Sequence, residues 1–184
     1  MNGMNETIRR IYFDTNVYIS LVEHSSAISK QISRLFGGWE GQSHLIVTSE
    51  FTLAEALVKP IKIALDTGNY TLHDTYIDWI ADEPDVRMVL PASRIILIRA
   101  ALVRAQLSRL AQIKVKLPDA IHIASALQGN CDVFITGDKD LQAAVQAIAQ
   151  RMGLKAGDPE TSLWRVMSLD PDELAALAEE LGCP

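Results

Sequence analysis

Short apolar runs rich in β-branched and aromatic residues alternate along this chain with longer segments of helical periodicity. A strand whose side chains are apolar on both faces must be buried by other elements on both faces, as the strands of a parallel sheet are. The intervening helices supply the crossover connections that parallel strands need. The pattern therefore predicts a three-layer α/β domain, in which a central parallel sheet of four to five strands is flanked by helices. The predicted strands are residues 11–13, 45–48, 86–90, 133–136 and 163–167.

Three helices are marked by their periodicity and their ends. Apolar residues recur at intervals of three and four from Leu141 to Met152, a stripe that would face the core and that a glycine ends. Near the C-terminus, Asp170 and Glu173 form a capping-box pattern ahead of another apolar stripe. Residues 93–111 are long enough for about five turns at a rise of 1.5 Å per residue.

The length of 184 residues is that of one compact domain. We expect the main domain over residues 1–156 and a C-terminal extension over 157–184, whose final helix packs on the same domain. The N-terminus lacks a basic region followed by an apolar core, so no signal peptide is predicted. The most apolar stretch, residues 88–103, is interrupted by proline and arginine and cannot form a membrane span of about 20 residues. With only two cysteines, at no metal-ligand spacing, the chain is predicted to be cytoplasmic, without membrane contact.

The charge balance argues against a general binder of phosphate backbones. Lys and Arg number 17 against 23 Asp and Glu, a formal net charge of −6, whereas such binders present a broadly positive face. A nuclease is not excluded, because a metal-binding carboxylate cluster itself adds negative charge. Arg94, Arg99, Arg104 and Arg109 recur every five residues, which advances about 140° per step around a helix. They therefore spiral around it, as expected of a solvated surface.

Several familiar sites are absent from the sequence, which contains no GxGxxG, GxxxxGK, GxSxG or HExxH pattern. What remains is carboxylates in particular places. Asp14 follows the first predicted strand, at the end where open α/β sheets bind their ligands. Alternatively, Asp14 only caps the next helix, since aspartate is a favoured N-cap residue.

Glu55 and Asp119 also have both functional and structural explanations. Glu55 lies in an otherwise apolar helical segment, but it could pair with Lys59 at i, i+4 on a solvated face. Asp119 follows Pro118 at the start of a nearly all-apolar helix, where the helix dipole favours an acid. An acid at the mouth of a buried helix is nevertheless suggestive of a site. His122, one turn further on, could support such a site, although a hydrogen-bonded core histidine is the expectation.

Two more acids, Asp138 and Asp140, follow the fourth strand in a Gly-containing turn, and Asp140 is expected to cap the next helix. A parallel fold would gather Asp14, Asp119 and Asp138 on one rim. Packing carboxylates together raises their pKa values by mutual repulsion, so such clusters persist where a hard cation neutralises them. Oxygen ligands without His or Cys predict Mg²⁺ or Mn²⁺ rather than zinc.

The sequence resembles the PIN domain family, and in particular VapC-type bacterial toxins and their stand-alone relatives. Four stretches, spanning most of residues 8–145 in the family order, carry the resemblance. They are Ile11-Tyr12-Phe13-Asp14-Thr15-Asn16, Val47-Thr48-Ser49 running to Leu53-Ala54-Glu55, Leu117-Pro118-Asp119-Ala120-Ile121-His122-Ile123-Ala124, and Val133-Phe134-Ile135-Thr136-Gly137-Asp138-Lys139-Asp140-Leu141.

The resemblance implies a PIN-like nuclease domain that cleaves RNA, with Mg²⁺ or Mn²⁺ as cofactor. A carboxylate-bound ion would activate water for attack on the phosphodiester. An endoribonuclease of this type would be the toxin of a toxin–antitoxin pair, with RNA as substrate and an antitoxin protein or a second copy of the chain as candidate partners. The residues that match the family's catalytic and metal-binding acids are Asp14, Glu55, Asp119 and Asp138, with Asn16, Thr136 and Asp140 as supporting residues.

Two other functions compete with a metal-dependent ribonuclease. A PIN-fold module that binds or regulates without cleaving would be favoured by the loss of an acidic position, and none is lost here. A metal-dependent phosphatase on a related α/β fold would need an Asp-x-Asp nucleophile at the first strand. Asn16 occupies the second of those positions, which disfavours the phosphatase.

Overall fold

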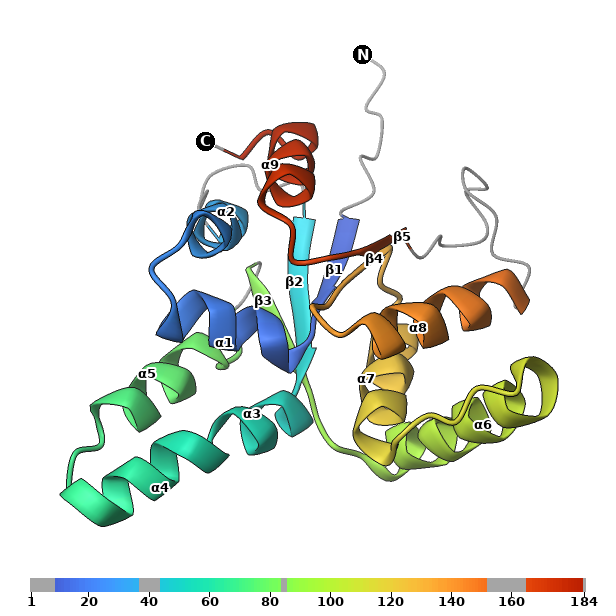
Figure 1. Cartoon of the computed structure of the whole chain (residues 1–184), viewed down its shortest axis with the longest axis horizontal. Coiled ribbons are helices and arrows are strands. Elements are labelled where there is room, and N and C mark those ends of the chain that lie inside the picture. The colour runs from blue at the N-terminus through green and yellow to red at the C-terminus, as the bar shows by residue number, and fades with distance from the viewer. Residues whose placement is uncertain (1–8, 37–43, 84–85, 152–164, 184) are drawn as a thin grey trace.

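The computed structural model describes residues 9–36, 44–83, 86–151 and 165–183 (Figure 1). Within these residues, five strands form one parallel sheet in the order β3-β2-β1-β4-β5. They are β1 (Arg9–Phe13), β2 (His44–Ser49), β3 (Arg87–Leu90), β4 (Val133–Ile135) and β5 (Arg165–Met167). The predicted strands are confirmed, except that residues 163 and 164 lie outside the described part of the chain.

The helices of the described residues include the three that the sequence marks. The apolar stripe that begins at Leu141 falls on α8, although Met152 lies outside the described residues. Ser93 caps α6, because its hydroxyl accepts a hydrogen bond from the Ile96 backbone N–H at 3.4 Å. None of these helices is long and apolar enough to span a membrane. The helices are α1 (Thr15–Glu23), α2 (Ala27–Phe36), α3 (Glu50–Ala56), α4 (Val58–Thr67), α5 (Thr71–Trp79), α6 (Arg94–Ala111), α7 (Leu117–Gln128), α8 (Lys139–Arg151) and α9 (Pro171–Glu180).

Alternate strand side chains enter two hydrophobic cores, one on each face of the sheet. Tyr12 packs in the core that α6, α7 and α8 cover, whereas Ile11 and Phe13 pack in the core that α1, α2 and α9 cover. Figure 1 shows these two groups of helices on opposite sides of the strands. Because both faces are buried, the strands read as continuous apolar runs, and the predicted three-layer arrangement is confirmed.

The strand order places a ligand-binding position between β1 and β4. From β1 the chain builds β2 and then β3 on one side of the sheet, and it later returns to add β4 on the other side of β1. Open α/β sheets bind ligands at the carboxyl ends of strands where the order reverses in this way. Asp14 directly follows β1, and its backbone N–H donates to the Ile135 carbonyl oxygen at the end of β4 at 3.2 Å.

The C-terminal segment contributes to the same sheet and core. Strand β5 pairs with β4, and α9 packs on α2. Asp170 caps α9 by accepting from the backbone N–H groups of Asp172 and Glu173 at 2.9 and 3.1 Å. Glu173 accepts from the N–H of Ser168, so the reciprocal half of the predicted capping box is displaced by two residues. The boundary at residues 156 and 157 lies outside the described part of the chain, so the division remains a prediction.

Leu177→Ala should show that α9 is integral to the domain. Leu177 is fully buried in the core formed with α1 and α2, so truncation should lower the free energy of unfolding by about 2–5 kcal/mol. Chemical denaturation would measure the loss. Glu179→Ala, at an exposed position of the same helix, is the control and should change stability by less than about 0.5 kcal/mol. Equal stability of the two variants would show that the domain does not depend on α9.

Candidate active site

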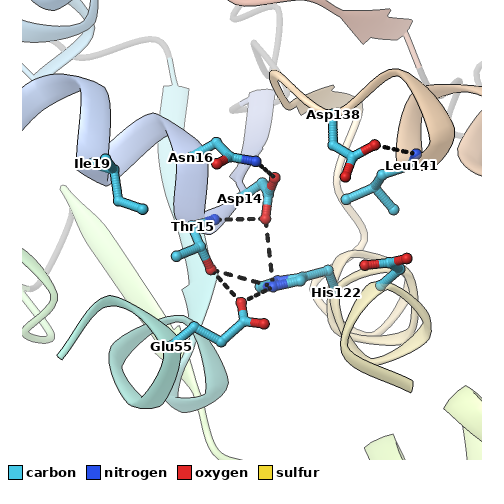
Figure 2. A pocket seen from close by; sticks show the side chains of 9 residues that line it. Asp14, Thr15, Asn16, Ile19, Glu55, His122, Asp138 and Leu141 are labelled. Atoms are coloured by element: carbon cyan, nitrogen blue, oxygen red, sulfur yellow. Dashed lines mark hydrogen bonds and ion pairs between the residues drawn. The ribbon is translucent and has the colours of Figure 1, made fainter. Parts of the chain in front are cut away.

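A pocket of about 260 Å³ opens at the carboxyl ends of β1 and β4 (Figure 2). All four acids that the sequence predicts as catalytic line it, together with Asn16, although they come from four separate segments of the chain. The lining residues are Asp14, Thr15, Asn16, Ile19, Glu55, Asp119, His122, Asp138 and Leu141. The fold therefore brings the predicted acids to one place.

Both oxygens of the buried Asp14 carboxylate accept hydrogen bonds. Oδ1 accepts from the backbone N–H of Thr15 at 2.6 Å, which makes Asp14 the N-cap of α1. Oδ2 accepts from the Thr136 hydroxyl at 2.6 Å and from the Asn16 amide at 3.3 Å. Asp14 therefore caps α1, as its structural explanation requires, and the same carboxylate lines the pocket, as its functional explanation requires. Thr136 supports Asp14 from the end of β4 without lining the pocket itself.

Glu55 faces the pocket from α3. Its Oε2 accepts from the Thr15 hydroxyl at 2.6 Å and lies 2.9 Å from His122 Nε2. Lys59 binds Glu23 instead, so the alternative i, i+4 pair with Glu55 is not formed. Burial alone would raise the pKa of Glu55, but the hydrogen bonds from His122 and Thr15 and the charge of His122 outweigh burial and hold that pKa below its ordinary value. The pocket therefore favours an ionised Glu55.

His122 is both a core residue, as expected, and a pocket residue. Its side chain is 2% exposed, with Nδ1 2.9 Å from the Tyr12 hydroxyl and Nε2 3.4 Å from Asp14 Oδ1. Burial would lower the pKa of His122, but the hydrogen bond with Glu55 and the charges of Asp14, Glu55 and Asp119 raise it on balance. The sequence signal for this role is a histidine one turn after Asp119, in a helix whose other residues are mostly apolar or small.

Asp119 lies half-buried in the first turn of α7. Burial raises the pKa of Asp119, and the charges of Asp138 and Asp14 add to that rise, whereas Lys116 and His122 oppose it. Burial is therefore the main cause of the upward pKa shift, and repulsion from the neighbouring acids is a smaller one.

Asp138, rather than Asp140, caps α8. Its Oδ1 accepts from the backbone N–H groups of Asp140 and Leu141 at 2.8 and 3.1 Å. The expectation for Asp140 was wrong because α8 already begins at Lys139, which puts Asp138 at the N-cap and within reach of the free N–H groups of the first turn. Asp140 is exposed and does not line the pocket, so its predicted supporting role remains a prediction.

The pocket fits a hard divalent cation in the chemistry of its donors, because its acids offer carboxylate oxygens, which Mg²⁺ and Mn²⁺ prefer. The two cysteines are buried free thiols and do not line the pocket. Across the described part of the chain, however, no three His, Cys, Asp or Glu side chains are already gathered closely enough to hold a metal ion. The acids surround a shared space and would have to draw together around a cation.

Comparison with known proteins identifies the fold. Residues 11–146 match the family model described as PIN domain, and no curated protein matches significantly. One similar structure is the Mycobacterium tuberculosis toxin VapC20, described as cleaving the sarcin–ricin loop. It is 18% identical in sequence and has a TM-score of 0.50, and the match covers 73% of this chain and 94% of the VapC20 chain. VapBC2 from Rickettsia felis, bound to a DNA fragment from its promoter, gives 13% identity and a TM-score of 0.55, covering 86% of this chain and 98% of the other. At these identities, the likeness to the solved structures shows a shared fold.

In the absence of divalent cations, Asp119→Asn should be at least as stable as the wild type near neutral pH. A raised pKa means that folding disfavours the ionised form of Asp119, so its carboxylate destabilises the fold above that pKa. The advantage of the amide should shrink as the pH falls and vanish below the ordinary pKa of an aspartate, where Asp119 is protonated in both states. Thermal unfolding in chelator across this pH range would measure it.

The control for this comparison is Asp66→Asn, which removes an exposed carboxylate that does not line the pocket. It should unfold like the wild type at every pH. A wild type that is more stable than Asp119→Asn near neutral pH would show that the Asp119 carboxylate has favourable partners which outweigh repulsion.

Proposed function

This chain belongs to the PIN domain family, and from that membership we propose that it is a ribonuclease that hydrolyses RNA phosphodiester bonds with a carboxylate-bound Mg²⁺ or Mn²⁺ ion. The observation that carries the proposal is the convergence of Asp14, Glu55, Asp119 and Asp138 on one pocket. Each acid alone has a structural explanation, but four of them around one space create a repulsion that a bound cation would relieve.

Asp14, Glu55, Asp119 and Asp138 would hold the cation. When bound, it would neutralise the acids and act as a Lewis acid that activates water for attack on phosphorus. The chain's own contribution is to hold Asp14 and Asp138 in place by hydrogen bonds, around which the other acids would draw together. Thr136 and Thr15 fix Asp14, and the first turn of α8 holds one oxygen of Asp138.

We also propose that the chain is the toxin of a toxin–antitoxin pair and acts in the cytoplasm. The support is the fold shared with VapC20, which is described as a toxin that cleaves the sarcin–ricin loop, and with VapBC2. An antitoxin and a second copy of the chain are the candidate partners. The competing function, a non-cleaving binding or regulatory module, is disfavoured because all four acids are present and line one pocket.

Purified wild type should cleave members of a panel of end-labelled RNAs in Mg²⁺ or Mn²⁺, and a chelator should suppress the cleavage. Asp14→Asn should lower the rate at least about 100-fold, the scale on which loss of a catalytic carboxylate acts. Asparagine keeps the cap of α1, so the variant should remain folded. Asp66→Asn, at an exposed position of α4, should cleave like the wild type.

Three results would count against the proposal in different ways. Cleavage that persists in chelator would remove the metal from the mechanism. A wild type that binds Mn²⁺ saturably but cuts none of the RNAs would favour the non-cleaving module. A wild type that neither binds Mn²⁺ nor cuts RNA would overturn the carboxylate site.

A further inference from the structure

A chain of hydrogen-bonding groups runs from the sheet through His122 to two of the acids. The Tyr12 hydroxyl, on β1, lies 3.4 Å from Ser49 Oγ and 2.9 Å from His122 Nδ1. His122 Nε2 lies 2.9 Å from Glu55 Oε2 and 3.4 Å from Asp14 Oδ1, as Figure 2 shows. Tyr12, Ser49 and His122 are all buried, so the protein itself must supply the partners of these polar groups.

The partners determine the orientation of the imidazole ring from both ends. An ionised carboxylate can only accept hydrogen bonds, so Nε2 of His122 carries the proton that faces Glu55. Nδ1 faces the hydroxyl of Tyr12, which can either donate or accept. If the imidazole ring were rotated by half a turn, a ring carbon would face Glu55 in place of Nε2, and Nδ1 would lose the hydroxyl of Tyr12 as its partner. The two contacts therefore define one ring orientation.

Aromatic packing holds this arrangement in place. Tyr12 stacks on Phe134 with ring centroids 5.0 Å apart, and its own ring lies edge-on to His122 at 6.0 Å. Phe51 of α3 contacts the His122 ring from another element at 5.7 Å. Because close-packed aromatic rings have few alternative rotamers, the imidazole is a fixed donor rather than a mobile one.

Glu55 is the acid that most needs such a donor. It projects from α3, a helix of only seven residues, and its side chain is 31% exposed. A glutamate so placed has several rotamers that point into solvent. His122 and Thr15 both bind Oε2, while Oε1 makes no hydrogen bond to any residue that the structure describes. The bound oxygen therefore anchors the carboxylate and leaves the other available.

We propose that His122, fixed by Tyr12, is a positioning residue that aims the carboxylates of Glu55 and Asp14 at the cation site. The inference rests on the proposed function for the identity of the ligand, a divalent cation. His122 acts through the acids and contacts neither cation nor RNA. Groups that hydrogen-bond to metal ligands set their direction, and their loss typically lowers metal affinity by about 10- to 100-fold.

Mn²⁺ binding to the full chain, measured by titration calorimetry and by the electron paramagnetic resonance of free Mn²⁺, tests this role in three variants. His122→Leu removes the donor and should weaken Mn²⁺ binding about 10-fold or more. His122→Gln keeps an amide N–H that can reach Glu55 and should restore most of the affinity. Tyr12→Phe keeps both His122 and the stack on Phe134, removes only the hydroxyl, and should give an intermediate affinity.

His44→Gln separates positioning from stability. His44 is another buried histidine, on β2, with Nε2 2.7 Å from the Leu35 carbonyl oxygen, and it does not line the pocket. This control should lower the unfolding temperature without changing Mn²⁺ affinity. In RNA cleavage, His122→Leu should lower kcat while leaving KM for RNA near the wild-type value, because the substrate is not contacted.

The outcomes distinguish this inference from the proposed function. Equal Mn²⁺ affinity in wild type, His122→Leu and Tyr12→Phe would overturn the inference. Tighter binding in both His122→Leu and His122→Gln would also overturn it, by showing that His122 competes with the cation. If wild type binds Mn²⁺ but cuts no RNA, the ribonuclease proposal fails, and the affinities still decide the role of His122. If wild type binds no Mn²⁺, both fall.

Discussion

The buried carboxylate of Asp14 is the constraint on which the site depends. A buried carboxylate is tolerated only when hydrogen bonds replace its lost hydration, and two of the groups around Asp14 (Thr136 and His122) come from elements far away in the sequence. Thr136 reaches it from the end of β4 and Thr15 from the start of α1, while His122 of α7 lies 3.4 Å away. Satisfying one group at the end of β1 therefore fixes the relative positions of the elements that border the pocket.

Two of the other acids, Glu55 and Asp119, have pKa values that are shifted in opposite directions. Glu55 has His122 and Thr15 as donors and remains readily ionised, whereas Asp119 faces Asp138 and holds a proton more easily. The pocket thus holds one carboxylate, Glu55, whose charge is compensated by His122 and Thr15, and one, Asp119, whose charge is poorly compensated.

The sheet and the positions of Asp14 and Asp138 could be predicted because their signals are local, whereas Glu55 lies inside a helix and joined the set only through the resemblance to the PIN domain family. An apolar run indicates a buried strand, and an acid that directly follows it must lie at the carboxyl end. A supporting role was one of two interpretations of His122, but its partner Glu55 could not be predicted, because Glu55 is 67 positions away and only the packing of α3 against α7 brings the two together. The cap of α8 was assigned to Asp140 because periodicity locates a helix start only to within about two residues. Helices α2 and α5 were not among the predicted helices, although Ile28, Ile32, Leu35 and Phe36 of α2 recur at helical spacing.

Asp14 and Asp138 each cap a helix with the carboxylate that also lines the pocket. A glutamate at either position would keep the charge but would be a poorer cap, because its longer side chain does not favour the N-cap geometry. Asparagine caps about as well as aspartate and carries no charge. Over generations of mutation, the exchange of aspartate for asparagine is thus the step that these two helix ends tolerate best. At Asp138, where the cap of α8 uses Oδ1 alone, a lineage can therefore lose the charge at little cost to the fold, so a well-folded relative need not be an active one.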